Sequence, residues 1–406
     1  MNNSRSILWK TVVWIIAFIG FGYSFYQSFR HTQNTFGTDL RNRIVGSRLM
    51  EAKIDPFFYH WNEKDNDEWL DPYHDPKQIN SRLSITPFAT HIHYPLNHVH
   101  YQKTRWFWLY FQYCIYLITV FILLCYAKTS FHWIIISLSI LPFTPGWFMH
   151  IERGQIYLLY LLIITLIYHF DRQKKFKINT FLIAILTLLR PTFILITLIF
   201  YFRKQYRRLI ECVLLILIFA VFHVFYVGSD LYQSYFESMK MFDAFNIENH
   251  LGDRYFLNFI EVEGMSNVQA IGDFNINNSS IQNFLWTVFQ IQIPKSFSLI
   301  LMFSYLAATL YWIKEKVNKN LMFLALLFIG ITIEYFIRAP RMPYNFVLWL
   351  PIIFELTTSK RTAIINVTTF ILLLMFIPII PYNLFISELS LAILFFYYAI
   401  HYKKFS

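Results

Sequence analysis

Long apolar stretches separated by short polar turns dominate the pattern of the chain. The longest are residues 11–26, 107–126, 209–227 and 320–337. Each approaches the roughly 20 residues that a helix needs to cross about 30 Å of hydrocarbon. Only helices or closed barrels satisfy their backbone hydrogen bonds in lipid, and these stretches lack the strict alternation of barrel strands. The pattern therefore predicts an all-α polytopic membrane protein.

The order of these stretches predicts a topology with two long loops. The expected spans are residues 7–27, 106–126, 132–149, 154–170, 209–227, 296–313, 321–336, 345–356, 362–377 and 384–401. The long loops are residues 28–105 and 228–295, and residues 231–245 have the apolar spacing of a helix lying in the membrane interface. Because the sequence shows no internal repeat, residues 1–406 are interpreted as a single integral membrane domain.

Two places in this topology carry polar groups near the membrane boundary. Spans 132–149 and 154–170 are expected to form a hairpin whose outer tip is residues 150–153. Residues 178–202 are apolar, but Arg190-Pro191 lies at their centre and basic clusters flank both ends. One straight span would place those clusters on opposite sides of the membrane, and proline breaks a helix. We therefore predict a re-entrant pair of short helices that meet at Arg190-Pro191.

Charge distribution orients the predicted bundle. Only 15% of the residues are charged, whereas a soluble domain has about 25%. The short turns carry 18 of the 35 Lys and Arg residues but only four acidic residues, and this bias assigns the turns to the cytoplasm. The N-terminus is then cytoplasmic and both long loops are extracytoplasmic. Because the turns account for the net charge of +11, the charge does not indicate a nucleic-acid partner.

An acidic residue beyond the first span is the strongest candidate for chemistry. Apolar residues recur at helical spacing from Leu40 to Ala52, so Thr38 or Asp39 is expected to cap a helix. Such a cap is worth about 1 kcal/mol. The alternative is that Asp39 acts as a general base for an acceptor hydroxyl. The residues alone favour the capping role, and the two roles can coexist.

Several further polar groups are expected near the outer face. They are Arg41, Asp55, Tyr59, His150, Arg153, Gln155, Arg190, Arg338, Arg341 and Tyr344. Ionisable groups at membrane depth usually line a cavity, and arginine can hold a phosphate through two parallel hydrogen bonds. For Arg338 and Arg341, contact with lipid head groups is an equally good interpretation. Four histidines at positions 91, 93, 98 and 100 lack the helical spacing of a zinc enzyme, so we expect no metal.

Short strings in chain order resemble glycosyltransferase family 87, whose members are membrane-embedded GT-C enzymes. Gly37-Thr38-Asp39-Leu40 and the later Asp55-Pro56-Phe57-Phe58-Tyr59 are similar to the opening of that family. Gly154-Gln155 resembles its G-Q-x-N element, with Tyr157 in place of Asn. Leu189-Arg190-Pro191 resembles its K-P element, with Arg in place of Lys, and Asn278-Ser279-Ser280 resembles a later N-x-S element. These departures leave the identity of the sugar open.

The resemblance implies a fold and a reaction. The fold is a GT-C-type bundle of about 10–12 membrane helices whose outer loops form the roof of the active site. The reaction is inverting transfer of a hexose, such as mannose, from a polyprenyl-phosphate sugar to a glycan or glycolipid acceptor, without a cofactor, at the bacterial inner membrane. The implied residues are Asp39 as base; Arg190, Arg153, Arg341 and Arg41 at the donor phosphate; and His150, Gln155, Asp55, Tyr59, Asn278 and Tyr344 in the substrate pocket.

Two other function classes stay open at this point. A transporter, flippase or polymerase of polyprenyl-linked glycans would carry its ionisable residues deep in the spans, often in repeat-related pairs. Here most of them lie in outer loops and tips, with Glu334 as one exception. This placement favours an enzyme at the outer face. A purely structural membrane subunit is the third interpretation.

Overall fold

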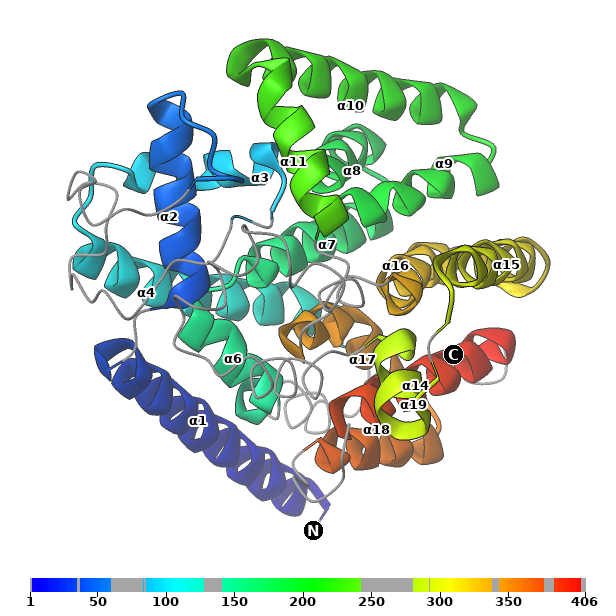
Figure 1. Ribbon diagram of the computed structural model, residues 1–406. Helices are drawn as coiled ribbons and strands as arrows, with labels where there is room; N and C mark the ends of the chain where they lie inside the picture. The colour runs from blue at the N-terminus through cyan, green and yellow to red at the C-terminus, as the bar shows by residue number, and fades with distance from the viewer. Residues whose placement is uncertain are drawn as a thin grey trace.

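The computed structural model describes residues 2–34, 37–59, 83, 85–127, 141–241, 280–291, 293–337, 343–375 and 383–402, and all regular structure in these ranges is helical (Figure 1). Its first half contains α1 (Asn2–Asn34), α2 (Thr38–Glu51), α3 (Pro87–Thr90), η1 (His91–Leu96), α4 (Tyr101–Leu124), η2 (Leu141–Phe143), α6 (Pro145–Arg153), α7 (Tyr157–Arg172), α8 (Phe176–Leu189), η3 (Pro191–Thr197) and α9 (Leu198–Phe202). Its second half contains α10 (Tyr206–Val227), α11 (Ser229–Met241), α14 (Ile281–Phe289), α15 (Lys295–Lys316), η4 (Lys319–Leu321), α16 (Met322–Thr332), η5 (Ile333–Phe336), η6 (Pro343–Trp349), α17 (Leu350–Thr357), α18 (Thr362–Leu374) and α19 (Asn383–Ile400).

Several of these helices can cross a membrane. Within the described ranges, α4, α10, α15 and the continuous run from η4 to η5 are long and apolar enough, and the bent pair of α6 and α7 makes a fifth span if it is counted as one. Shorter apolar helices, including α8, α18 and α19, pack among them. The predicted first span lies inside α1. The expectation of an all-α polytopic membrane protein is therefore confirmed.

The helices divide into an outer layer and a centre. Only 11% of the apolar window of α10 is buried, and Phe222 and Phe225 expose 70% and 86% of their surface. Every residue of α16 is buried, in contrast, from Met322 to Thr332. A helix that is apolar all round belongs in a protein core, whereas an exposed apolar face such as that of α10 suits lipid. Figure 1 accordingly shows α10 and α15 at the edge of the bundle and α16 and α17 inside it.

The predicted break at Arg190-Pro191 is present. Helix α8 ends at Leu189, Arg190 is extended with φ −145° and ψ 97°, and η3 begins at Pro191. The chain then returns, because Arg203 after α9 pairs with Asp171 before α8, with Nη2 and Oδ2 2.9 Å apart. Both basic ends of this stretch therefore lie at one end of the bundle, as expected for a re-entrant pair.

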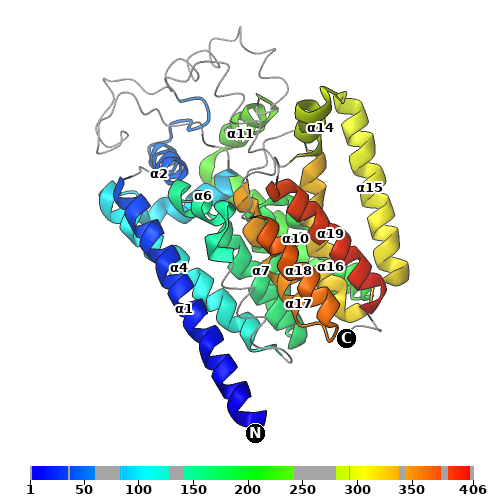
Figure 2. The same ribbon diagram turned by 90° about the horizontal axis from the view of Figure 1, so that it is seen from below.

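Other described basic turns share that end. Arg172 donates to the buried carboxylate of Glu355 at 3.1 Å, and Arg203 also donates to the carbonyl of Lys319 at 3.3 Å. Figure 2 shows both chain termini at this end, with α2, α11 and α14 at the opposite end. These basic turns therefore gather at one end of the bundle, whereas Lys128, Lys403 and Lys404 lie outside the described residues.

The expected tip at residues 150–153 differs in its local structure. These residues end the short helix α6, whose axis makes an angle of 114° with that of α7. Local signals start α6 as a separate helix just before the tip. The hydroxyl of Thr144 caps α6 by accepting from the amide of Trp147, and Pro145 occupies its first turn. The polar residues are consequently held on a helix rather than on a hairpin loop. Helix α11 matches the predicted interfacial helix as far as Met241, and residues 242–245 lie outside the described ranges.

Candidate active site

The start of α2 corrects the expected cap. The N-cap is Gly37 rather than Thr38 or Asp39, and no side chain makes the capping hydrogen bond. Gly37 has φ 61°, in the left-handed region that glycine tolerates best. The hydroxyl of Tyr101 on α4 donates to its carbonyl at 3.1 Å. Asp39 therefore lies in the first turn of α2 with its carboxylate available for other contacts.

The turn between α6 and α7 approaches α2 closely. Gly154 ends α6 with φ 68°, and the next amide, of Gln155, donates to the carbonyl of His150 at 2.9 Å. A Cβ atom at position 154 would lie 2.5 Å from the Cβ of Leu40. Both the backbone conformation and this contact require glycine, which explains the Gly-Gln string at this turn.

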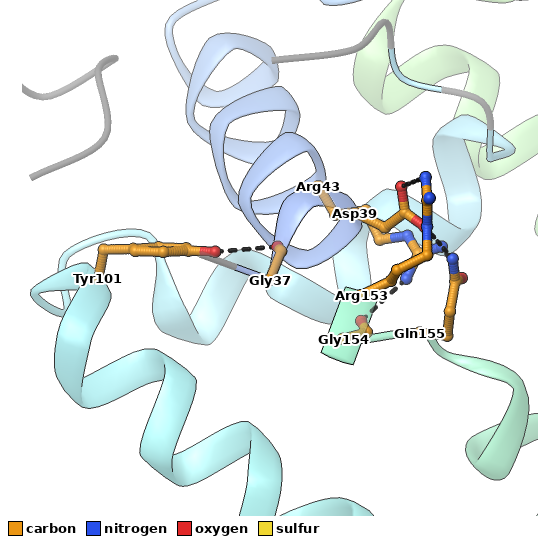
Figure 3. Close-up of polar contacts among 7 residues, drawn as sticks. All are labelled: Gly37, Asp39, Arg43, Tyr101, Arg153, Gly154 and Gln155. Carbon is orange, nitrogen blue, oxygen red and sulfur yellow. Dashed lines mark hydrogen bonds and ion pairs between the residues drawn. The ribbon is translucent and has the colours of Figure 1, made fainter. Parts of the chain in front are cut away.

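Asp39 is held by two residues from this turn (Figure 3). Arg153 donates from Nε to Oδ2 at 2.7 Å and from Nη2 to Oδ1 at 3.0 Å. Gln155 donates to Oδ2 through its Nε2. Two parallel charge-assisted hydrogen bonds fix both the position and the plane of a carboxylate. The Asp39 side chain is 14% exposed and that of Arg153 is 35% exposed, so Arg153 is the more accessible member of the pair.

Arg43 completes this cluster and was missed from the sequence. Its Nη1 donates to the carbonyl of Gly154 at 3.1 Å and its Nη2 donates to Oε1 of Gln155. Arg43 follows Asp39 by one helical turn. This i, i+4 spacing is the sequence signal that could have indicated Arg43 as a neighbour of Asp39. The sequence prediction chose Arg41 instead. Arg41 is buried in α2, and a spacing of two residues directs its side chain away from the face that carries Asp39.

A second ion pair lies at the tip of the re-entrant pair. Arg190 donates to Glu334 of η5 from Nε at 2.9 Å and from Nη2 at 2.5 Å, and the hydroxyl of Thr192 donates to the same carboxylate at 2.9 Å. The guanidinium also lies over the ring of Tyr157, 4.5 Å from its centroid. The Arg190 side chain is 13% exposed and that of Glu334 is 9% exposed. The break in the re-entrant pair thus positions a buried ion pair.

Aromatic rings connect the two ion pairs. Tyr157 begins α7 two residues after Gln155, and its ring centroid lies 5.1 Å from that of Tyr344 on η6 and 6.3 Å from that of His150. The hydroxyl of Tyr344 is within electrostatic range of Asp39 and Arg153. His150 is fully buried, and its Nε2 accepts from the amide of Leu158 at 3.3 Å. His150 therefore secures the turn that carries Arg153.

The other residues predicted for the site have contacts outside the two ion pairs or lie outside the described residues. Oδ1 of Asp55 accepts from the amide of Phe57 at 2.8 Å and shapes the turn that buries Phe57 against Tyr235 of α11. Tyr59 is half-buried near the end of the same segment. Asn278, Arg338 and Arg341 lie outside the described residues.

The four histidines at positions 91, 93, 98 and 100 have separate partners. His91 contacts His223 of α10, with Nδ1 and Nε2 2.9 Å apart, and His98 contacts Glu51 at 3.1 Å. His93 stacks on Trp108, and burial, with the nearby charge of Arg43, lowers its pKa to about 3. The ring of His100 caps α4 by accepting from the amide of Gln102. In the described part of the chain, no three His, Cys, Asp or Glu side chains converge in a way that could hold a metal ion.

Fold and site together define a polytopic helical membrane protein with a charged site at the end opposite its basic turns. The sequence model of glycosyltransferase family 87 matches residues 86–375, well over half of the chain. The protein belongs to glycosyltransferase family 87 and is therefore a transferase of glycosyl groups, as the resemblance of its motifs implied. The matched segment includes Arg153, Gln155 and Arg190, and Asp39 precedes it. No curated protein and no solved structure matches the chain.

Proposed function

We propose that this glycosyltransferase moves a hexose from a polyprenyl-phosphate sugar to a hydroxyl of a glycan or glycolipid, with Asp39 as general base. The observation that carries the proposal is the partly exposed carboxylate of Asp39, which Arg153 and Gln155 hold in a fixed plane. Among the described carboxylates, this one combines a partly exposed position with a bidentate arginine and a place between the helices of the outer end.

The location of the site supports a lipid-linked donor. Helix α2, which carries Asp39, lies at the end opposite the described basic turns (Figure 2), and the positive-inside bias assigns those turns to the cytoplasm. The site then faces the outside of a bacterial inner membrane. A sugar on a polyprenyl phosphate reaches this level from the outer leaflet, because its lipid chain stays in the hydrocarbon.

In the proposed step, the acceptor hydroxyl gives its proton to Asp39 while its oxygen attacks the anomeric carbon. The bond from that carbon to the phosphate oxygen breaks, and its electron pair leaves with the polyprenyl phosphate, so the configuration inverts. The hydrogen bonds from Arg153 and Gln155 fix the orientation in which the carboxylate meets the acceptor.

The leaving phosphate needs a cation, since negative charge develops there in the transition state. Arg153 is the best placed of the described arginines because it is partly exposed and lies beside the base. Arg190 is turned toward Glu334 and lies behind Tyr157. We therefore assign the phosphate contact to Arg153 and the neighbouring sugar contacts to Tyr157 and Tyr344.

The test is transfer from polyprenyl-phosphate hexoses by the purified full chain carrying Asp39→Asn. We expect a loss of about 100-fold or more, the range of general-base catalysis. Glu51→Gln is the matched control, because it makes the same carboxylate-to-amide change at the far end of α2, where Asn97 and His98 bind Glu51. Normal transfer by a folded Asp39→Asn variant would contradict the assignment, and translocation of the lipid-linked sugar without transfer would favour a transporter.

A further inference from the structure

Opposite charges one turn apart on α2 do not pair directly with each other. Asp39 and Arg43 have the i, i+4 spacing at which an acid and a base usually form an ion pair. The amide of Gln155 lies between them instead (Figure 3). It accepts from Arg43 through Oε1 and donates to Asp39 through Nε2. A single side chain from the α6–α7 turn thus connects the cation to the carboxylate.

The direction of this amide is dictated by its neighbours. A guanidinium only donates hydrogen bonds, and an ionised carboxylate only accepts them. Turning the amide over would point its NH₂ group at Arg43 and its oxygen at Asp39, which replaces two favourable contacts with two repulsive ones. Arg43 is only 5% exposed, so little solvent screens these contacts. Its second hydrogen bond, to the carbonyl of Gly154, holds the turn itself.

We propose that Arg43 is a positioning residue that acts on the base Asp39 through the amide of Gln155. It fixes Nε2 of Gln155 toward the carboxylate and so holds Asp39 in one orientation. The inference rests on the proposed function, because it assumes that Asp39 is the base. Arg43 itself touches neither the acceptor nor the donor.

Other charged and titratable groups surround this chain of contacts. Arg153 of α6 contacts Asp39 directly, and the hydroxyl of Tyr344 on η6 faces the same charges. His93 on η1 and His150 on α6 face Arg43. The test therefore compares kcat with KM at one pH, so that titration of these neighbours does not enter the comparison.

The experiment is a double-mutant cycle on the full chain with Arg43→Gln, Gln155→Met and the double variant. Transfer from a polyprenyl-phosphate hexose is measured as kcat and KM at one pH. Each single change is expected to lower kcat about 10- to 100-fold, the scale of losing a partner that orients a functional side chain. The double variant is expected to be no slower than Gln155→Met, because Arg43 acts through that amide. Arg43→Gln should lower kcat while KM changes little, because Arg43 orients the base and touches neither substrate, and Arg43→Lys recovers most of the activity.

Arg48→Gln is the matched control. Arg48 lies on the same helix and donates to the backbone carbonyls of Asn97 and Val99, so its loss weakens packing without touching Gln155. Its kcat should stay close to that of the wild type, and thermal melting identifies any variant that fails to fold. Losses that multiply in the double variant, or an unchanged kcat in Arg43→Gln, overturn the role of Arg43. A folded wild-type protein without any transfer contradicts the proposed function instead, and the role of Arg43 falls with it.

Discussion

Two arginine–carboxylate pairs lie near each other at one end of the bundle, and they share a bidentate geometry but differ in the exposure of their arginine. In the pair of Asp39 and Arg153, the carboxylate is 14% exposed, and the guanidinium, at the end of α6, is 35% exposed. In the pair of Arg190 and Glu334, both side chains are at most 13% exposed, and Thr192 and Tyr157 surround them.

We expect this difference to separate a catalytic pair from a structural pair. Solvent reaches the guanidinium of Arg153, so this arginine can bind a second anion, such as a phosphate, beside Asp39. A buried pair leaves an uncompensated charge when one partner is removed, which costs about 3–5 kcal/mol. The Arg190–Glu334 pair thus joins the tip of the re-entrant helices to η5, and we expect the Asp39–Arg153 pair to be the one that meets substrates.

Removing each carboxylate should give the largest contrast. Asp39→Asn should lower transfer by about 100-fold or more, with almost unchanged thermal stability. Glu334→Gln should lower the free energy of unfolding by about 3 kcal/mol or more, because it leaves the charge of Arg190 buried without a counter-ion. Transfer per folded protein and melting in detergent measure the two effects. The comparison fails if Glu334→Gln is as stable as the wild-type protein.

Removing Arg190 together with its partner tests whether that pair touches the donor. Arg190→Ala alone should destabilise the protein by about 3–5 kcal/mol, because Glu334 is left buried and charged. The apolar double replacement of Arg190→Met with Glu334→Leu should restore most of that stability. We expect its activity per folded molecule to stay within about 10-fold of the wild type. A larger loss in a stable double variant would place Arg190 at the donor phosphate.

Some features of these two ion pairs could be predicted from the sequence, and others could not. The break at Arg190-Pro191 was predictable, because proline and flanking basic clusters leave few other topologies. The partnership with Glu334 was not, since the two residues are 144 positions apart and only packing brings them together. At Asp39 the sequence suggested a cap, but the neighbouring Gly37 took that position and left the carboxylate for Arg153 and Gln155.

Gly154 allows the turn after α6 to approach α2 closely, which brings Arg153 to Asp39. Its replacement should have an intermediate effect. In Gly154→Ala the new Cβ meets Leu40 at 2.5 Å, and the backbone has φ 68°. We expect a loss of about 1–3 kcal/mol in stability and a lower kcat, because α2 and Arg153 move apart. Gly22→Ala is the matched control, since a Cβ there meets no atom within 4 Å. Melting temperatures and kcat of both variants decide whether the close contact matters.

Exchanging each arginine for lysine should give the smallest and most discriminating effects. Lysine keeps the charge but loses the planar fork that holds both carboxylate oxygens. At position 190 the charge next to Glu334 matters most, so Arg190→Lys should change transfer less than about threefold and lower the melting temperature by a few degrees. The family element that this string resembles carries lysine at this place, which agrees with that tolerance. At position 153 the fork orients the base, so Arg153→Lys should lower kcat/KM about 10-fold while the melting temperature stays constant. Equal kinetic losses at the two positions would mean that both arginines serve the reaction, and the division between a catalytic and a structural pair would then be wrong.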